Sequence, residues 1–338
     1  MSKSFPTFVK QTLAGVSSGG TALEIILKAI GIKGREVILP TDTFVATANA
    51  VLLAGGTPVF ADISKETLAL QIESVEQLIN GNTAAVITVH MFGLIAHDFF
   101  DLKELCMRRN VPLIEDAAHA HGAKIDNLAA GSLGLAAAFS FYPTKVITTG
   151  EGGVISTDDK DIFQKILILR NHGKSLDAPV FEEVSNNYRM AEIPAIIGIH
   201  QTRLLQQNIS LRRSIANQYR EALSKHPLIS LLPEKTPEAN VYWRFPLYLS
   251  ESVDRIKLQS FMESEFNVRV NWMYEPLCHK QPVFMKNIPS YTEISLPNAE
   301  WCMEHLLCLP SHPGLSPDDL SRVIKGLIEG LSQKVCKR

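Results

Sequence analysis

The amino-acid sequence predicts an α/β fold, in which helices cover both faces of a mostly parallel central sheet, followed by a smaller C-terminal α+β domain. Apolar runs of strand length alternate with helix-length segments through the first half of the chain. The runs are apolar almost without interruption, which is typical of strands buried on both faces of a parallel sheet. Such sheets bind ligands at the carboxyl ends of their strands, where the following loops gather.

Six of these runs are predicted to be buried strands, and four intervening segments have helical length. The strands are residues 36–40, 58–62, 84–90, 111–116, 137–142 and 152–157. The helices are residues 21–31, 43–54, 71–80 and 98–109. The last strand follows its neighbour after only a turn.

A long helical pattern over residues 192–224 is interpreted as a connector between two domains. The mixed pattern beyond it predicts strands at 241–249 and 267–273, helices at 253–265, 297–307 and 317–331, and loops at 234–240 and 274–282. We therefore predict a large domain of residues 1–224, which includes the connector, and a small domain of residues 225–338.

Composition and charge narrow the functional classes. The 338 residues are 46% hydrophobic and carry a formal net charge of −2, so no global field favours nucleic acid or an anionic membrane. The N-terminus MSKSFPTFVK lacks the apolar stretch of a signal peptide, and no run reaches the length of a membrane span, so we expect a cytoplasmic protein. The five cysteines form no Cys-x-x-Cys pair, so we expect reduced thiols and no zinc site built on them.

Small residues and glycines open directly into a helical pattern in VSSGGTALEIIL, residues 16–27. Free backbone N–H groups at such a helix N-terminus, together with the helix dipole, suit a phosphate group. The alternative is ordinary capping of the helix by Ser18. The stretch also matches Gly-x-Ser-x-Gly over residues 15–19, which raises an acyl hydrolase with Ser17 as nucleophile. That motif normally follows several strands, and only 14 residues precede it here, which disfavours the hydrolase.

A predicted buried strand ends in two carboxylates, and two histidines follow, in LIEDAAHAHGA, residues 113–123. Asp116 lies where a ligand would bind and could hold a cationic group, whereas Glu115 should point to the other face. One alternative is a metal site of Asp116, His119 and His121, which would need a further ligand and an open position. Another is purely structural, with acids at a helix N-terminus and histidines whose hydrogen bonds are satisfied.

Lys145 stands between two apolar runs and close to a glycine cluster in AAAFSFYPTKVITTGEGGVIST, residues 136–157. A cramped apolar pocket lowers the pKa of a lysine, which makes its amine a nucleophile toward carbonyls and a proton shuttle. An arbitrary lysine is more often a surface residue. Here a phosphate site, a strand-end aspartate and this lysine share one domain. They match the phosphate, the pyridinium nitrogen and the aldehyde of pyridoxal phosphate.

Several motifs, in their order along the chain, resemble the DegT/DnrJ/EryC1/StrS family of sugar aminotransferases. They are LPTDTFVATANAVLLAGGTPVFADI (39–63), EDAAHAHGA, FSFYPTKVITTGEGG, RNHGK (170–174), NNYRM and PLCHKQPVF (276–284). The resemblance covers roughly residues 16–330. It implies a fold type I pyridoxal-phosphate enzyme that acts as a homodimer with shared active sites.

The resemblance also implies roles for individual residues. Lys145 resembles the lysine that forms a Schiff base with the cofactor, and Asp116 resembles the partner of the pyridinium nitrogen. Phe44 resembles the aromatic residue that stacks on the cofactor ring, and Asn187 resembles the asparagine that reaches the phosphate from the other subunit. Ser140 and the turn at 19–22 resemble the phosphate anchors. The cofactor-binding residues implied in this way are Gly20, Thr21, Ala22, Phe44, Asp116, His119, Ser140, Lys145 and Asn187, and no metal ion is implied.

Three features depart from the family's pattern. His119 stands where glutamine is common near the cofactor's phenolic oxygen, and it can also donate a hydrogen bond there. Gly20 stands at the usual threonine, so that hydroxyl contact would be lost or supplied by Thr21. The segment before the glycine turn is shorter than is usual in the family. We therefore expect an N-terminal helix to be missing, which bears on activity more than on fold.

The implied reaction is a ping-pong amino transfer from a donor, glutamate by resemblance, to a keto-sugar carried on a nucleoside diphosphate. Lys145 would move the proton. Relatives that dehydrate a sugar carry histidine at the lysine position, so Lys145 argues against dehydration. The alternative from another class is a catalytically silent or regulatory relative of the same fold. Candidate substrate-side residues are His312, His172 and Arg189.

Overall fold

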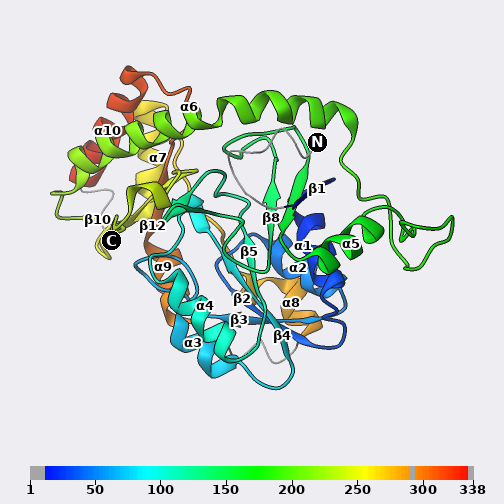
Figure 1. Ribbon diagram of the computed structural model, residues 1–338. Coiled ribbons are helices and arrows are strands. Elements are labelled where there is room, and N and C mark those ends of the chain that lie inside the picture. Colours follow the sequence, from blue (N-terminus) through cyan, green and yellow to red (C-terminus); the bar gives the residue numbers. More distant parts are fainter. Residues whose placement is uncertain (1–11, 289–293, 334–338) are drawn as a thin grey trace.

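The structure is a computed structural model that describes residues 12–288 and 294–333. Its centre is a seven-stranded sheet in the order β1-β9-β8-β5-β4-β2-β3 (Figure 1). In that order the strands are Thr12–Val16, Gly153–Thr157, Ala136–Ser140, Leu113–Asp116, Thr83–Val89, Glu36–Pro40 and Thr57–Ala61. The strands from β8 to β3 are parallel, and β9 is antiparallel to both β8 and β1. The predicted mostly parallel sheet is therefore confirmed.

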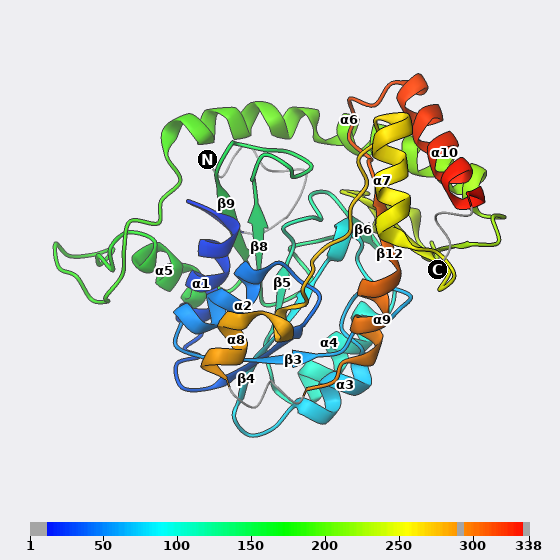
Figure 2. The same cartoon turned by 180° about the vertical axis from the view of Figure 1, so that it is seen from behind.

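Helices cover both faces of this sheet (Figures 1 and 2). One group consists of α1 (Gly19–Ala29), α2 (Val45–Leu53) and α5 (Lys160–Leu169), with α1 in contact with both others. The other consists of α3 (Ile72–Leu78) and α4 (Phe99–Arg108). Because β3 and β4 lie on opposite sides of β2, right-handed crossovers place α2 and α3 on opposite faces. All but α5 were predicted.

The first strand, β1, was missed by the sequence analysis. Its residues, TLAGV, include alanine and glycine, which are weak strand formers. It lies at the edge of the sheet and pairs only with β9, so a partner distant in sequence stabilises it. Consequently α1 begins directly after a strand-to-helix turn, at the same end of the sheet as the carboxyl end of β8.

The long connector helix α6 (Glu192–Leu223) extends from the large sheet to a smaller one (Figure 1). The smaller sheet is antiparallel, in the order β10-β11-β12. Its strands are Ile229–Leu231, Phe245–Leu249 and Leu306–Leu309, and its helices are α7 (Arg255–Phe266) and α10 (Pro317–Ser332). Together with the end of α6, these elements share a second hydrophobic cluster, distinct from the one around the large sheet.

Two later helices return to the large sheet. They are α8 (Pro282–Asn287) and α9 (Pro297–His305). At the start of α9, the N–H groups of Asn298 and Ala299 donate to the Asp62 carboxylate at 3.0 and 2.8 Å. The segment after residue 224 thus contributes to both hydrophobic clusters, and a domain boundary at 224 stays a prediction.

The predicted strand over 241–249 is too long. The strand β11 begins only at Phe245, because Tyr242 has a φ of 48°, which is incompatible with an extended chain. The residues between them, Trp243 and Arg244, therefore leave the sheet and reach a neighbouring cleft.

The predicted strand over 267–273 is wrong. Asn267 ends α7 in the left-handed conformation, and only an isolated bridge from Asn271 to Cys308 follows. The apolar pattern there reflects burial of alternate side chains without a continuous ladder. The helix predicted over 297–307 ends at His305, where β12 takes over.

Short elements complete the fold, some of them within predicted loops. They are the 3₁₀ turns η1 (Met91–Gly93), η2 (Pro237–Ala239) and η3 (Cys278–Lys280) and the small hairpin of β6 (Lys124–Ile125) and β7 (Leu128–Ala129). None of the helices within the described residues combines the length and apolar character needed to cross a bilayer. Cys106, Cys278, Cys302 and Cys308 are buried free thiols, and Cys336 lies outside the described residues.

Candidate active site

A cleft lies at the carboxyl ends of β2, β5 and β8, beside the first turn of α1. Its cavity volume is about 480 Å³, which lies within the usual range of small-molecule sites. The predicted residues that line it are Gly20, Phe44, Asp116, His119, Ser140 and Lys145. One wall comes from distant residues that the sequence analysis did not single out, namely Trp243, Arg244, Met273 and Tyr274.

Lys145 reaches the cleft from the turn that follows β8. Its backbone N–H donates to the Tyr142 carbonyl at 3.0 Å, and its Nζ lies 4.7 Å from the centre of the Trp243 ring. Burial lowers the pKa of Lys145 to about 8, although the Asp116 carboxylate acts in the opposite direction. Near pH 8 a much larger fraction of this amine is therefore neutral and nucleophilic than in a free lysine, as the sequence predicted.

Asp116 is the last residue of β5, and two hydrogen bonds fix its buried carboxylate. Oδ2 accepts from the Thr47 hydroxyl at 2.8 Å, and Oδ1 accepts from the Ala118 N–H at 3.1 Å. Both carboxylate oxygens retain further lone pairs at the cleft wall. The site can therefore present an oriented anion to a cationic or N–H group of a ligand.

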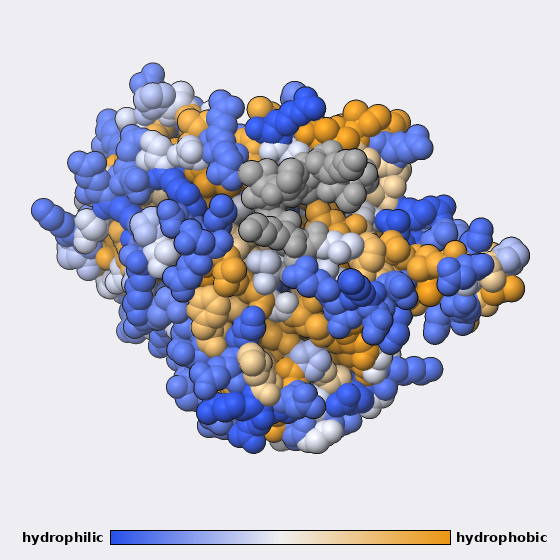
Figure 3. Space-filling view, viewed as in Figure 1, coloured by the Kyte–Doolittle hydropathy of each residue, from blue (hydrophilic) through white to orange (hydrophobic). Residues whose placement is uncertain are grey.

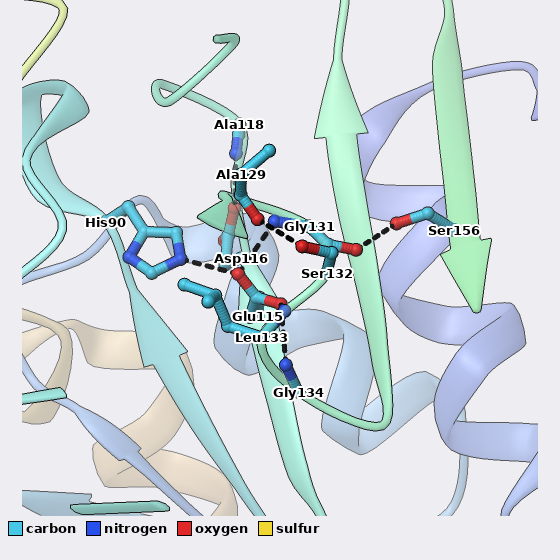
Figure 4. A network of polar contacts seen from close by, with 10 residues as sticks. All are labelled: His90, Glu115, Asp116, Ala118, Ala129, Gly131, Ser132, Leu133, Gly134 and Ser156. Carbon is cyan, nitrogen blue, oxygen red and sulfur yellow. Dashed lines mark hydrogen bonds and ion pairs between the residues drawn. The ribbon is translucent and has the colours of Figure 1, made fainter. Parts of the chain in front are cut away.

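Glu115, one residue earlier, does not line the cleft, as predicted, and Figure 4 shows its carboxylate directed at His90 and at the backbone of residues 131–134. Its fully buried carboxylate accepts from the N–H groups of Gly131, Leu133 and Gly134, each at 2.7 Å. The His90 ring completes the set at 2.9 Å. These contacts fasten the loop that leads into β8 to the end of β5, and so they hold the strands that carry Asp116 and Ser140.

The first turn of α1 approaches the end of β8 very closely. A Cβ atom at Gly19 would lie 2.6 Å from the Ser140 Cβ, so only glycine permits this contact. The N–H groups of the first helical residues have no partner within their helix, and Ser18 caps only Thr21, whose N–H it accepts at 3.1 Å. The N–H groups of Gly19 and Gly20 are thus available to an anion beside Ser140.

An aromatic cluster forms another wall of the cleft. Phe44 is 52% exposed, and its ring centre lies 5.4 Å from that of Tyr274. The Tyr274 hydroxyl is 3.3 Å from His119 Nε2, and the His119 ring stacks on Trp243 with 3.7 Å between ring centres. Burial, followed by the charge of Lys145, holds the pKa of His119 well below its usual value, so this ring is neutral.

Several predicted residues lie away from the cleft. They are Thr21, Ala22, Asn187, His172, Arg189 and His312. The Thr21 hydroxyl turns back toward Ser17 and Ser18, and Ala22 is fully buried in the core. The Thr21 hydroxyl is thus hydrogen-bonded within its own turn, and its contact with a phosphate stays a prediction.

The metal and hydrolase alternatives find no support in this geometry. No group of three or more histidine, cysteine, aspartate or glutamate side chains within residues 12–288 and 294–333 could hold a metal ion. His121 lies among apolar rings, 5.3 Å from Phe139 and 5.0 Å from Phe141. The Ser17 hydroxyl donates to Thr21 rather than to a histidine base.

The cleft fits pyridoxal phosphate. Asp116, Lys145 and the first turn of α1 present a carboxylate, an amine and free N–H groups within one cavity. In addition, His119 Nδ1 is buried without a hydrogen-bond partner in the described part of the chain. A buried polar atom without a partner is costly, and a bound group with oxygen and nitrogen atoms would relieve that cost.

Comparison with known proteins assigns the family. The model of the DegT/DnrJ/EryC1/StrS aminotransferase family matches residues 2–328. The chain belongs to this family. Its sequence is 34% identical over 330 residues to GDP-perosamine synthase of Caulobacter vibrioides, with 94% of this chain and 85% of that protein covered.

Solved structures of similar fold support the same family assignment. DesV from S. venezuelae in complex with ketimine intermediate has a TM-score of 0.90 and 31% identity, with 98% of this chain and 88% of that one covered. NtdA from Bacillus subtilis with bound cofactor PMP has a TM-score of 0.87 and 27% identity, with 96% and 74% covered. This member of the family is therefore a sugar aminotransferase with a pyridoxal phosphate cofactor and the corresponding fold, as the resemblance implied.

Proposed function

We propose that the protein transfers an amino group from glutamate to a keto-sugar carried on a nucleoside diphosphate. The observation that carries the proposal is that Lys145, with a lowered pKa, and the oriented carboxylate of Asp116 open into one cleft beside the first turn of α1. The similarity to GDP-perosamine synthase makes a keto-sugar on guanosine diphosphate the first acceptor to test.

Pyridoxal phosphate, when bound, supplies an electron sink for the charge that develops on the reacting carbon. The chain's residues would bind and orient it. Asp116 would keep the ring nitrogen protonated, because Thr47 and Ala118 hold its carboxylate in place. The N–H groups of Gly19 and Gly20 would hold the phosphate together with the Ser140 hydroxyl.

The other residues of the cleft would complete the reaction site. Lys145 would attach the cofactor and then carry a proton at Nζ, for which a pKa of about 8 is well matched. Neutral His119 would meet the phenolic oxygen with a hydrogen bond. Phe44 would cover one face of the ring and exclude water.

We also propose that the enzyme is a homodimer with shared active sites. Apolar side chains are exposed on the arm before α6 and at the start of that helix, where Figure 3 shows hydrophobic surface. Val184 is 98% exposed, Phe181 68% and Ile193 73%, and a second copy would remove them from water. Asn187 projects from the same arm and does not line its own cleft, which supports its predicted contact with the partner's phosphate.

The dimer proposal has a direct test. Variants Lys145→Ala and Asn187→Ala would each be inactive alone. If sites are shared, mixed dimers of the two contain one site with both residues intact, so mixing should restore up to about half of the activity per hybrid dimer. A monomer by light scattering, or no recovery after subunit exchange, would contradict shared sites.

The central test is spectroscopic. Purified protein with cofactor should show a visible absorbance that glutamate bleaches, and a keto-sugar nucleotide should restore it with an amino-sugar product in the mass spectrum. A colour that persists with every amino donor would instead favour the catalytically silent relative. The presence of Lys145 in the cleft favours the active enzyme.

A further inference from the structure

Arg244 is a cation at the cleft wall that has no role in the reaction proposed above. It follows Trp243 and precedes β11, and its Cζ lies 5.2 Å from the centre of the Trp243 ring. Its Nε is buried without a hydrogen-bond partner, and its guanidinium forms no ion pair within the described residues. Arg212 also has an unpartnered Nε, but only Arg244 of the two lines the cleft, so its guanidinium is the one that can pair with a bound anion.

The backbone that carries Arg244 is held rigidly. The buried Arg212 donates through Nη1 to the carbonyls of Tyr242 and Trp243, both at 3.2 Å. The Ser311 hydroxyl donates to the same two carbonyls, at 2.9 and 3.2 Å. Such support is typical of a binding residue whose position matters.

The position of Arg244 selects among the anions of the reaction. The cofactor phosphate has its own place at Gly19 and Ser140. A diphosphate on the acceptor is separated from the reacting carbon by the sugar ring, whereas the α-carboxylate of an amino-acid donor is attached to the reacting carbon itself. Lys145, which must reach that carbon, and Arg244 both lie against the Trp243 ring. Of these three anions, the α-carboxylate is therefore the one that the chemistry requires to lie close to Lys145.

We propose that Arg244 binds the α-carboxylate of the amino donor and so determines which amines the enzyme accepts. Its planar fork matches a carboxylate with two parallel hydrogen bonds. Glu151 also lines the cleft but forms no ion pair with Arg244 in the described structure, so a protein carboxylate does not already occupy that role. The inference rests on the proposed aminotransferase function.

The experiment compares donors in the first half-reaction, followed by the bleaching of the bound cofactor after rapid mixing. The variants are Arg244→Gln and Arg244→Lys, with Arg269→Gln as control, because the Arg269 side chain is 87% exposed and outside the cleft. The donors are glutamate, its side-chain amide glutamine, and its α-amide. Cofactor affinity of each variant and GDP binding by calorimetry are measured alongside.

We expect Arg244→Gln to lower kcat/KM about 10- to 100-fold with both glutamate and glutamine, with Arg244→Lys intermediate and Arg269→Gln unchanged. The α-amide should react poorly with the wild type and no worse with Arg244→Gln, because the two changes remove the same contact. Cofactor affinity and GDP binding should stay within about 2-fold.

Other outcomes would overturn the inference. An effect confined to glutamate would assign Arg244 to the side-chain carboxylate, one confined to GDP would assign it to the acceptor, and a loss of cofactor affinity would assign it to the cofactor. Equal bleaching of wild type and Arg244→Gln by glutamate would show that Arg244 has no role in donor binding. If glutamate and glutamine leave even the wild type unbleached, the proposed function fails instead.

Discussion

The two sides of the end of β5 differ in whether their buried polar groups have hydrogen-bond partners. On one side, the Glu115 carboxylate accepts three backbone N–H bonds and one from a histidine ring. On the other, His119 Nδ1 and Arg244 Nε are buried without a partner in the described structure, and burial disfavours the charge of Lys145. The satisfied carboxylate of Glu115 holds the scaffold together, whereas His119 and Arg244, which line the cleft, keep polar atoms that no described residue satisfies.

The largest loss of activity should follow from a substitution on the side of β5 that faces the cleft. Lys145→Ala removes the amine that attaches the cofactor and carries the proton, so turnover should fall by about 10⁴-fold. The measurement is the rate of amino transfer, together with borohydride reduction and peptide mapping, which should place the wild-type label at position 145. A label elsewhere would refute this role for Lys145.

Neighbouring carboxylates give a matched pair that tests the comparison directly. Glu115→Gln should cost about 2–4 kcal/mol of unfolding free energy, because its amide group would face N–H donors in a buried site. Asp116→Asn should cost about 1 kcal/mol or less but reduce turnover by about 10²–10³-fold. Urea denaturation measures the stability of both variants, and steady-state kinetics measures their turnover. Equal losses of stability and of turnover in the two variants would contradict the distinction between scaffold and cleft.

The pKa of Lys145 gives a smaller, pH-dependent effect. Since burial lowers that pKa to about 8, the unfolded chain binds more protons than the folded one between about pH 8 and the ordinary lysine pKa of 10.5. Stability of the cofactor-free protein should therefore rise with pH in this window, relative to Lys145→Met, and the full cost of burying the ammonium should be present below it. A flat difference in unfolding free energy would show that the amine is well solvated.

The smallest effect should come from Ser17. Its hydroxyl makes one partly buried hydrogen bond to Thr21 at 3.2 Å, so Ser17→Ala should change stability by less than about 1 kcal/mol. Amino transfer should be unaffected. An esterase activity of the wild type that this variant abolishes would revive the hydrolase alternative.

The part of the site that could be predicted consists of residues that lie within short sequence motifs. Asp116 and Ser140 end apolar strands and Lys145 follows one, each within a motif that resembles the family's, and parallel strands bring their carboxyl ends together. Glu115 was correctly expected on the opposite face, because side chains alternate along a strand. These features need no knowledge of distant contacts.

The rest of the site depends on long-range packing. Trp243 and Arg244 enter the cleft because Tyr242 adopts a positive φ and because Arg212 and Ser311 hold the carbonyls of Tyr242 and Trp243. Tyr274 is brought in partly by its N–H, which donates to the Asp42 carboxylate at 3.3 Å. No local pattern signals these contacts, just as none signalled β1 or the absence of a strand at 267–273.

The close contact of Gly19 with Ser140 has a practical meaning for protein engineering. Because an added methyl group would collide with the end of β8, selection for new acceptors should return glycine at this corner whatever sugar is supplied. Met273 and Tyr274 also line the cleft, and they belong to a segment far from α1 in the sequence. A library intended to broaden the sugar range should therefore randomise those two positions and leave the glycine corner intact.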